Sequence, residues 1–227
     1  MHRNMWEIRQ SAEKPDSLEL YIYSTVEPDG WWSESETSAE HFRKELEQHP
    51  DAKEITVYIN SLGGSVMEGI AIYNQLKRHP AHITVRVDGF ACSIASVIAM
   101  AGDQVIMPKN TVMMIHNAWT VALGNARELR KAADDLEVIN QASRQAYLEK
   151  AGDKLSEDKL TELLDAETYL TAAQCMELGL CDSFGDEDDS TEADTKQLTG
   201  QAVRDRLEQE LSQRREKAVA ALNKYFG

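Results

Sequence analysis

Two side chains in this sequence have the chemistry and the setting for acyl transfer, Ser93 and His116. Ser93 comes soon after the strand-like stretch Ile83–Val87 and begins a run of small and apolar residues typical of a buried helix. The first N–H groups of a helix have no partner within it, so a serine at such a junction presents its hydroxyl beside free donors. Acyl transfer at a serine requires that combination. For an isolated serine, capping the helix would be the simpler interpretation.

Two further features favour chemistry over capping. A double glycine, Gly63-Gly64, lies in the turn after the strand Ile55–Ile59, and His116 directly follows the strand Thr111–Ile115. In a mostly parallel sheet, the loops that leave the carboxyl ends of the strands meet at one edge. We therefore expect the glycine turn, Ser93 and His116 to converge, although a Gly-Gly pair alone would serve an ordinary tight turn.

Strands and helices alternate along most of the chain, which predicts an α/β domain with a mostly parallel sheet. A long, charge-rich helix is expected over Asn125–Ala151, and at about 27 residues it would span roughly 40 Å. Such a helix is expected to protrude from the domain and pack against another subunit. The other expected elements are strands at Leu18–Tyr23 and Asp103–Met107 and helices from a capping box at Thr37–Glu40 to about His49, at Val66–Arg78, Ser93–Ala101, Ser156–Leu164 and Thr171–Leu178.

Composition limits the class of protein. The formal net charge of −15 argues against a surface for nucleic acid or anionic lipid. Three cysteines without paired spacing indicate a reducing compartment, and neither a signal peptide nor a transmembrane run is evident. These features predict a cytoplasmic protein that binds neither nucleic acid nor membrane.

The chain is expected to have three parts: a globular domain over residues 1–184, an acidic linker over residues 185–195 and a C-terminal amphipathic helix over residues 196–227. The linker is too acidic to bury apolar surface. The helix carries one apolar stripe and needs a partner to cover it. The stripe consists of Val203, Leu207, Leu211, Ala218 and Leu222.

Four blocks of the sequence together resemble the ClpP family of serine peptidases. They are Tyr58–Val66, Gly89–Ala95, Met114–His116 and Glu167–Ala173, the last followed by Gly179–Asp182. The similarity covers about Leu18 to Phe184. Within the family, the resemblance is closest to the ClpP-like head maturation (prohead) proteases of phages and prophages. The opening strand, the Trp31-Trp32 loop and the Glu-Thr-Tyr-Leu-Thr block indicate that branch. The resemblance implies a ClpP/crotonase-like fold of repeated β-β-α units with a protruding handle helix.

The resemblance also implies roles for individual residues. Ser93 matches the nucleophile, His116 the general base, and the backbone N–H groups of Gly64 and Ile94 the oxyanion hole. The family acid is an aspartate, whereas Glu167 occupies the matching position here; Asp165 is the alternative acid. No metal or organic cofactor is implied.

The sequence also departs from the family pattern outside the acid position. After His116, the family's glycine-rich substrate-binding strand is thinner here, with Gly124 as the single glycine in Ala118–Asn125. Leu62 stands where the family usually has proline, and Cys92 replaces a small residue. A cysteine nucleophile is conceivable, but packing is the preferred role for Cys92. The N-terminal segment that lines the axial pore of the housekeeping proteases has no evident match, so an ATPase unfoldase is not expected as a partner.

The resemblance predicts a serine endopeptidase that cleaves polypeptides, namely capsid or scaffold proteins during phage head maturation. It would act in the bacterial host cytoplasm or within the prohead. It would assemble as a homo-oligomeric ring, a heptamer or double heptamer by family default. The alternatives are a general Clp-type chamber fed by an unfoldase, a non-catalytic structural ring, and a crotonase-type protein acting on acyl-CoA, which would not need a Ser-His pair.

Overall fold

The computed structural model describes residues 8–10, 16–28 and 38–185, together with six helical positions between 209 and 220. The chain divides into two units, Met1–Ala118 with Ile139–Asp186, and Trp119–Val138 with Glu187–Gly227. The first unit contains the sheet and every residue of the candidate site. The Trp31-Trp32 loop, most of the expected linker and the apolar stripe beyond it lie outside the described residues. The three-part division of the chain stays a prediction.

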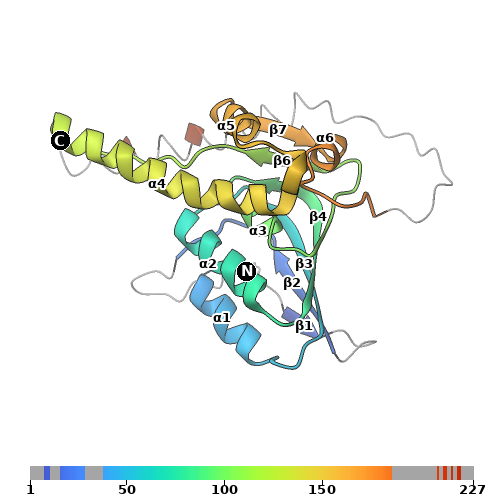
Figure 1. Ribbon diagram of the computed structural model, residues 1–227. Coiled ribbons are helices and arrows are strands. Elements are labelled where there is room, and N and C mark those ends of the chain that lie inside the picture. Colours follow the sequence, from blue (N-terminus) through green and yellow to red (C-terminus); the bar gives the residue numbers. More distant parts are fainter. Residues whose placement is uncertain are drawn as a thin grey trace. The chain divides into compact units, whose positions relative to one another are not determined.

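The described strands form one mixed, mostly parallel sheet in the order β1-β2-β3-β4-β6-β7, with β5 paired to β4 (Figure 1). Strands β2, β3, β4 and β6 run parallel, and the edge strands β1 and β7 are antiparallel to their neighbours. This arrangement confirms the predicted α/β class. The strands are β1 (Ile8–Gln10), β2 (Ser17–Ile22), β3 (Glu54–Ser61), β4 (His82–Cys92), β5 (Gln104–Ile106), β6 (Val112–Ile115) and β7 (Thr168–Thr171).

Six α-helices connect or follow these strands within residues 38–185. Helices α1 and α2 lie side by side in Figure 1, and α3 packs against α2 and the ends of the neighbouring strands. Alternate residues of β2, β3 and β4 are buried, which places the core between the sheet and these helices. The helices are α1 (Ala39–Glu47), α2 (Val66–Arg78), α3 (Ile94–Ala99), α4 (Ala126–Ala151), α5 (Glu157–Asp165) and α6 (Ala172–Glu177), with a short 3-10 helix at Gly152–Lys154 after α4.

Strand β4 is longer than the predicted Ile83–Val87 and continues to Cys92. The extension exists because β4 has two partners along one side. Its first half pairs with β5 at Thr84–Arg86, and its last residues, Phe90–Cys92, pair with β6. The first residues of the Gly89–Ala95 block are therefore strand, not turn. Strand β7, which the sequence analysis did not predict, pairs with β6 on the opposite side from β4.

The boundaries of helices α1 and α3 also differ from the sequence prediction. Helix α1 is capped by Ser38, whose hydroxyl accepts a hydrogen bond from the His41 N–H, so the expected box beginning at Thr37 is displaced by one residue. The carboxylate of Glu68 on α2 accepts from the Ala39 N–H and completes this cap from a distant segment. Helix α3 spans Ile94–Ala99, shorter than the predicted Ser93–Ala101.

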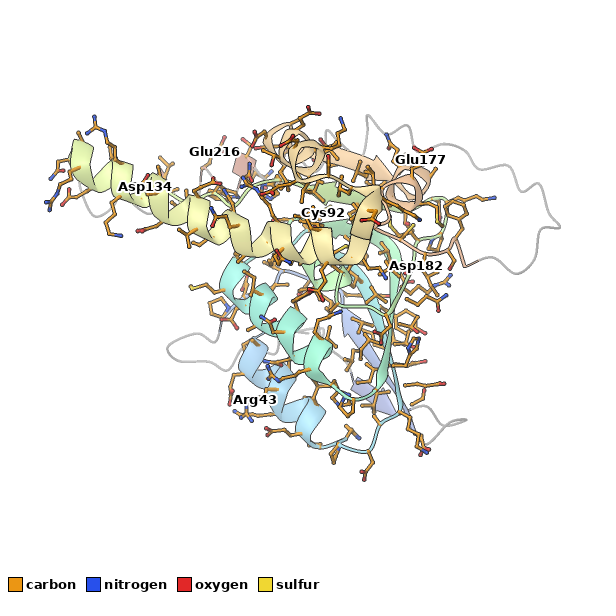
Figure 2. The ribbon with its side chains drawn as sticks, viewed as in Figure 1. Arg43, Cys92, Asp134, Glu177, Asp182 and Glu216 are labelled. Atoms are coloured by element: carbon orange, nitrogen blue, oxygen red, sulfur yellow. The ribbon has the colours of Figure 1, made fainter. Side chains whose placement is uncertain are left out.

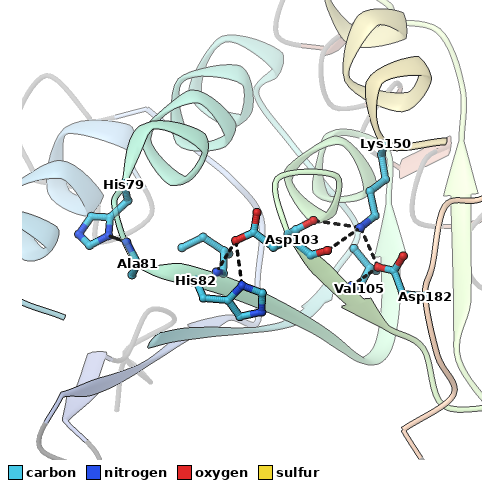
Figure 3. A network of polar contacts seen from close by, with 9 residues as sticks. His79, Ala81, His82, Asp103, Val105, Lys150 and Asp182 are labelled. Atoms are coloured by element: carbon cyan, nitrogen blue, oxygen red, sulfur yellow. Dashed lines mark hydrogen bonds and ion pairs between the residues drawn. The ribbon is translucent and has the colours of Figure 1, made fainter. Parts of the chain in front are cut away.

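The long helix α4 changes character along its length. No side chain between Ala126 and Ile139 is buried, whereas its last three turns bury residues such as Ala146 and Tyr147. Near the C-terminal end of α4, the Lys150 ammonium donates to the carbonyl oxygens of Gly102 and Asp103 and to the Asp182 carboxylate (Figure 3). Lys150 therefore fixes this end of α4 to the loop before β5.

Within the described part of the chain, no helix combines the length and the apolar composition needed to cross a membrane.

Candidate active site

Ser93 is the single residue between the end of β4 and the start of α3. Its backbone has φ 54° and ψ −130°, a conformation that residues with a side chain rarely adopt. Its N–H donates to the Met114 carbonyl of β6 at 2.8 Å, so the turn is tied to the strand that leads to His116. The Ser93 side chain makes no capping hydrogen bond to α3. The simple helix-cap interpretation is therefore wrong.

Ser93 and His116 are in direct contact. The Nε2 atom of His116 lies 2.7 Å from the Ser93 Oγ, a normal hydrogen-bonding distance. Both residues are partly buried. The predicted convergence of these two strand ends is present, and the pair has the geometry needed for proton transfer from serine to imidazole.

The glycine turn after β3 reaches the same place. A Cβ atom on Gly63, where φ is +89°, would lie 2.6 Å from the Ser93 Cβ and 3.1 Å from the Ile94 nitrogen. The Gly63 N–H donates to the buried Ser61 hydroxyl at 3.1 Å, and its carbonyl accepts from the Val26 N–H. Only a residue without a side chain allows this approach, so the turn after β3 and the turn after β4 form one surface.

The two expected oxyanion-hole donors belong to this surface. Gly64 pairs with Val26 in an isolated parallel bridge, but the bonds of that bridge use the Gly63 carbonyl and the Ser65 N–H. The Gly64 N–H is not part of it. The Ile94 N–H belongs to the first residue of α3 and has no acceptor within the helix.

The two candidate acids have different surroundings. The Asp165 carboxylate, at the end of α5, accepts a hydrogen bond from the Asn117 Nδ2 at 2.7 Å. Glu167 directly precedes β7 and has a positive φ of 47°. Apart from glycines, Ser93 and Glu167 are the two residues of the described chain with positive φ. Rare backbone conformations of this kind concentrate at functional sites.

Cys92 is buried next to Ser93 at the end of β4 (Figure 2). Burial raises the pKa of its thiol to about 12. A cysteine acts as a nucleophile only as the thiolate, so Cys92 is inert near neutral pH. The preferred interpretation of Cys92 as a packing residue agrees with this environment.

Two contacts next to Ser93 and His116 were not predicted from the sequence. Asn117 donates a hydrogen bond to Asp165, as described above. Ser96 forms hydrogen bonds both to the Ser93 carbonyl and to Tyr147 on α4. The contact of Ser96 with Ser93 could have been predicted from the sequence, because the two residues are one helical turn apart. The contact with Tyr147 could not, since only the tertiary packing of α4 brings that residue to this place.

Comparison with known proteins decides the family. The Clp protease family model matches residues 35–188, more than half of the chain. The chain belongs to the Clp protease family. A curated relative, the ATP-dependent Clp protease proteolytic subunit of Ligilactobacillus salivarius (strain UCC118), is 31% identical over 142 residues, which cover 61% of this chain and 71% of that protein. Family membership identifies this Clp protease chain as a peptide-bond hydrolase, and the contact between Ser93 and His116 lies inside the matched region.

Proposed function

We propose that this Clp protease is a serine endopeptidase in which Ser93 is the nucleophile and His116 the general base. The observation that carries the proposal is the 2.7 Å contact between the His116 Nε2 and the Ser93 Oγ at the turn between β4 and α3. His116 takes the Ser93 proton as Ser93 Oγ attacks the peptide carbonyl, and the same proton then passes to the leaving amine. Water, deprotonated by His116, hydrolyses the acyl-enzyme in the second half of the reaction.

In this proposal the N–H groups of Gly64 and Ile94 stabilise the negative charge that develops on the carbonyl oxygen. The close approach of the Gly63 backbone to Ser93 and Ile94 supports this role, because both donors must reach the same oxygen atom. Glu167 is proposed to orient the imidazole of His116 and to stabilise its positive charge, with Asp165 as the alternative acid. No step of this mechanism requires a metal or an organic cofactor.

Labelling with a serine-directed fluorophosphonate tests the nucleophile. We expect the unaltered protein to be labelled at Ser93, located by peptide mass spectrometry, and Ser93→Ala to lose both the label and peptidase activity. Ser156→Ala is the matched control, because Ser156 only caps α5 and should leave the labelling unchanged. Persistent labelling of Ser93→Ala, or a label on Ser96, would contradict the assignment.

We further propose that the natural substrates are capsid or scaffold proteins of a phage or prophage. Support comes from the resemblance of the Trp31-Trp32 loop and the Glu167–Thr171 block to the head maturation proteases. The protein should then cut the capsid precursor from the same genome at a few defined sites without ATP. Ser93→Ala should leave the precursor intact. Absence of cleavage by an enzyme that still hydrolyses short peptides would reject this substrate class.

A general proteolytic chamber that works with an ATPase is the second candidate, favoured by the name of the Ligilactobacillus relative. This function predicts that an unfolded or tagged protein is degraded to short peptides only when an unfoldase and ATP are present. A few defined cuts and complete degradation are readily separated by mass spectrometry of the products.

A further inference from the structure

A buried chain of hydrogen bonds runs from helix α4 to the backbone of Ser93. The Tyr147 Oη lies 2.6 Å from the Ser96 Oγ, which in turn lies 2.5 Å from the Ser93 carbonyl oxygen. Ser96 and Tyr147 are almost completely buried, at 0% and 1% exposure. The mechanism proposed above uses neither side chain. Two polar side chains buried in the core need a reason to be there, because apolar residues could fill the same space at no desolvation cost.

The donor of each hydrogen bond in this chain follows from the groups present. A backbone carbonyl can only accept, so the single proton of Ser96 is donated to the Ser93 oxygen. Ser96 must then accept its second bond from the Tyr147 hydroxyl. Burial raises the pKa of Tyr147 above its ordinary value, so this hydroxyl stays protonated and able to donate.

The Ser93 carbonyl and the Ile94 N–H belong to the same peptide group. A trans peptide is planar, and its C=O and N–H point in opposite directions. The Ser93 oxygen accepts both from the Ser96 hydroxyl and from the Ser96 N–H at 3.0 Å, so its two acceptor positions are occupied. Fixing this oxygen fixes the direction of the Ile94 N–H on the opposite side of the peptide.

This peptide needs external support, because the Ser93 torsions are not in a favoured region. The value ψ −130° at Ser93 sets the rotation of the Ser93–Ile94 peptide, and φ 54° is unfavourable for a residue with a side chain. Tyr147 is itself held in place, since Lys150 ties the next turn of α4 to the loop before β5 (Figure 3).

We propose that Tyr147 and Ser96 are positioning residues that hold the Ser93–Ile94 peptide so that the Ile94 N–H faces the oxygen of the reacting carbonyl. This inference rests on the proposed function, in which Ile94 supplies an oxyanion donor. An interaction that matters only when the oxyanion forms changes kcat and leaves substrate binding nearly unchanged. A structural role would show no such selectivity.

The test is Tyr147→Phe, which removes one hydroxyl and keeps the ring in the core. We expect kcat on a fluorogenic peptide to fall roughly tenfold, less than the full loss of one oxyanion donor, with KM within about twofold. A peptide aldehyde, whose adduct with Ser93 carries the oxyanion, should bind roughly tenfold more weakly. The affinity of a non-cleavable peptide should not change.

Tyr73→Phe is the matched control. Tyr73 is also mostly buried, and its hydroxyl lies 3.3 Å from the Glu149 carboxylate of α4, so this variant also removes a tyrosine hydrogen bond to α4. It should leave kcat and aldehyde affinity unchanged. Ser96→Ala interrupts the same chain with a smaller change of volume and carries the test if Tyr147→Phe does not fold. In the double variant with Tyr147→Phe, the increase in the activation free energy should be smaller than the sum of the two single increases, because both side chains act on one peptide.

Two results would overturn the inference. In the first, Tyr147→Phe and Ser96→Ala have the same kcat and the same aldehyde affinity as the control Tyr73→Phe. In the second, Tyr147→Phe loses as much affinity for the non-cleavable peptide as for the aldehyde. Failure of the proposed function looks different, since the unaltered protein would then not be labelled at Ser93 by a fluorophosphonate. An active, labelled enzyme with an unaffected Tyr147→Phe variant rejects only the positioning role.

Discussion

Ile115 and Thr168 lie directly opposite each other, as the last pair of the antiparallel ladder between β6 and β7. The residue that follows β6 is His116 and the residue that precedes β7 is Glu167, so both stand at the same end of this strand pair. Residues at the same end of two paired strands lie close enough for their side chains to meet, so we expect the Glu167 carboxylate to reach the His116 imidazole. Asp165 is the last residue of α5, and its carboxylate accepts a hydrogen bond from Asn117. We therefore favour Glu167 as the acid.

The first prediction concerns this acid. Glu167→Gln should lower kcat by roughly three to four orders of magnitude, because an amide cannot stabilise the imidazolium that forms during attack. Asp165→Asn should change kcat by only a few-fold, since asparagine can still accept from Asn117. Steady-state kinetics on a fluorogenic peptide distinguish the two, and circular dichroism checks that both variants are folded. The opposite ranking would assign the role to Asp165.

The second prediction concerns the glycine turn. Gly63→Ala should lower kcat by at least about a hundredfold, the scale of losing an oxyanion donor, because its Cβ would displace Ser93 and Ile94. Gly152→Ala is the control: Gly152 also has a positive φ, of +57°, but its Cβ would have nothing within 4 Å. Gly152→Ala should cost about 1 kcal/mol of stability and no activity. Equal activity of the two variants would show that the close approach of Gly63 is not needed.

The third prediction is a pH dependence of stability. Burial raises the pKa of Cys92 to about 12, whereas an exposed cysteine titrates near 8.5. The folded pKa is the higher one, so the stabilisation is complete below about pH 8.5 and is lost as the pH rises towards 12. Between pH 7 and pH 9.5, ionisation of this one thiol should lower the free energy of unfolding by on the order of 1 kcal/mol.

Cys92→Ala is the variant that isolates this effect. Urea unfolding at both pH values in the presence of a reductant should give a smaller decrease for Cys92→Ala than for the unaltered protein. The buried Cys175 and Cys181 remain in both proteins and supply the common background. An unchanged pH dependence would contradict the assigned environment of Cys92.

The fourth prediction concerns assembly. Leu129, Ala132, Leu136 and Ile139 recur along α4 with the spacing of a helix-pairing stripe, and none of them is buried within the described chain. We predict that this stripe packs against another copy of the protein in a homo-oligomeric ring. Leu129→Glu should lower the sedimentation coefficient, whereas Arg127→Glu, at a position that is already charged, should not. An unaltered protein that sediments as an active monomer would reject the ring.

The site was predictable where short segments determine it. Helix α2 has the predicted bounds Val66–Arg78, and Ser93 and His116 meet because the strands that carry them end at the same edge of the sheet. The features that were missed depend on partners distant in sequence. Strand β7 forms only against β6, and the cap of α1 uses Glu68 from another helix. Tyr147 gives no local signal, since its hydroxyl matters only through Ser96.

The positive φ angles of Ser93 and Glu167 lower the stability of the fold at two positions that the proposed mechanism needs. Each unfavourable conformation costs about 1–3 kcal/mol, and a glycine at either position would relieve that cost. A lineage released from selection for proteolysis would therefore gain by acquiring glycine at one of these positions. Among relatives with the same fold, such a glycine would mark a degenerate enzyme that keeps only its scaffold.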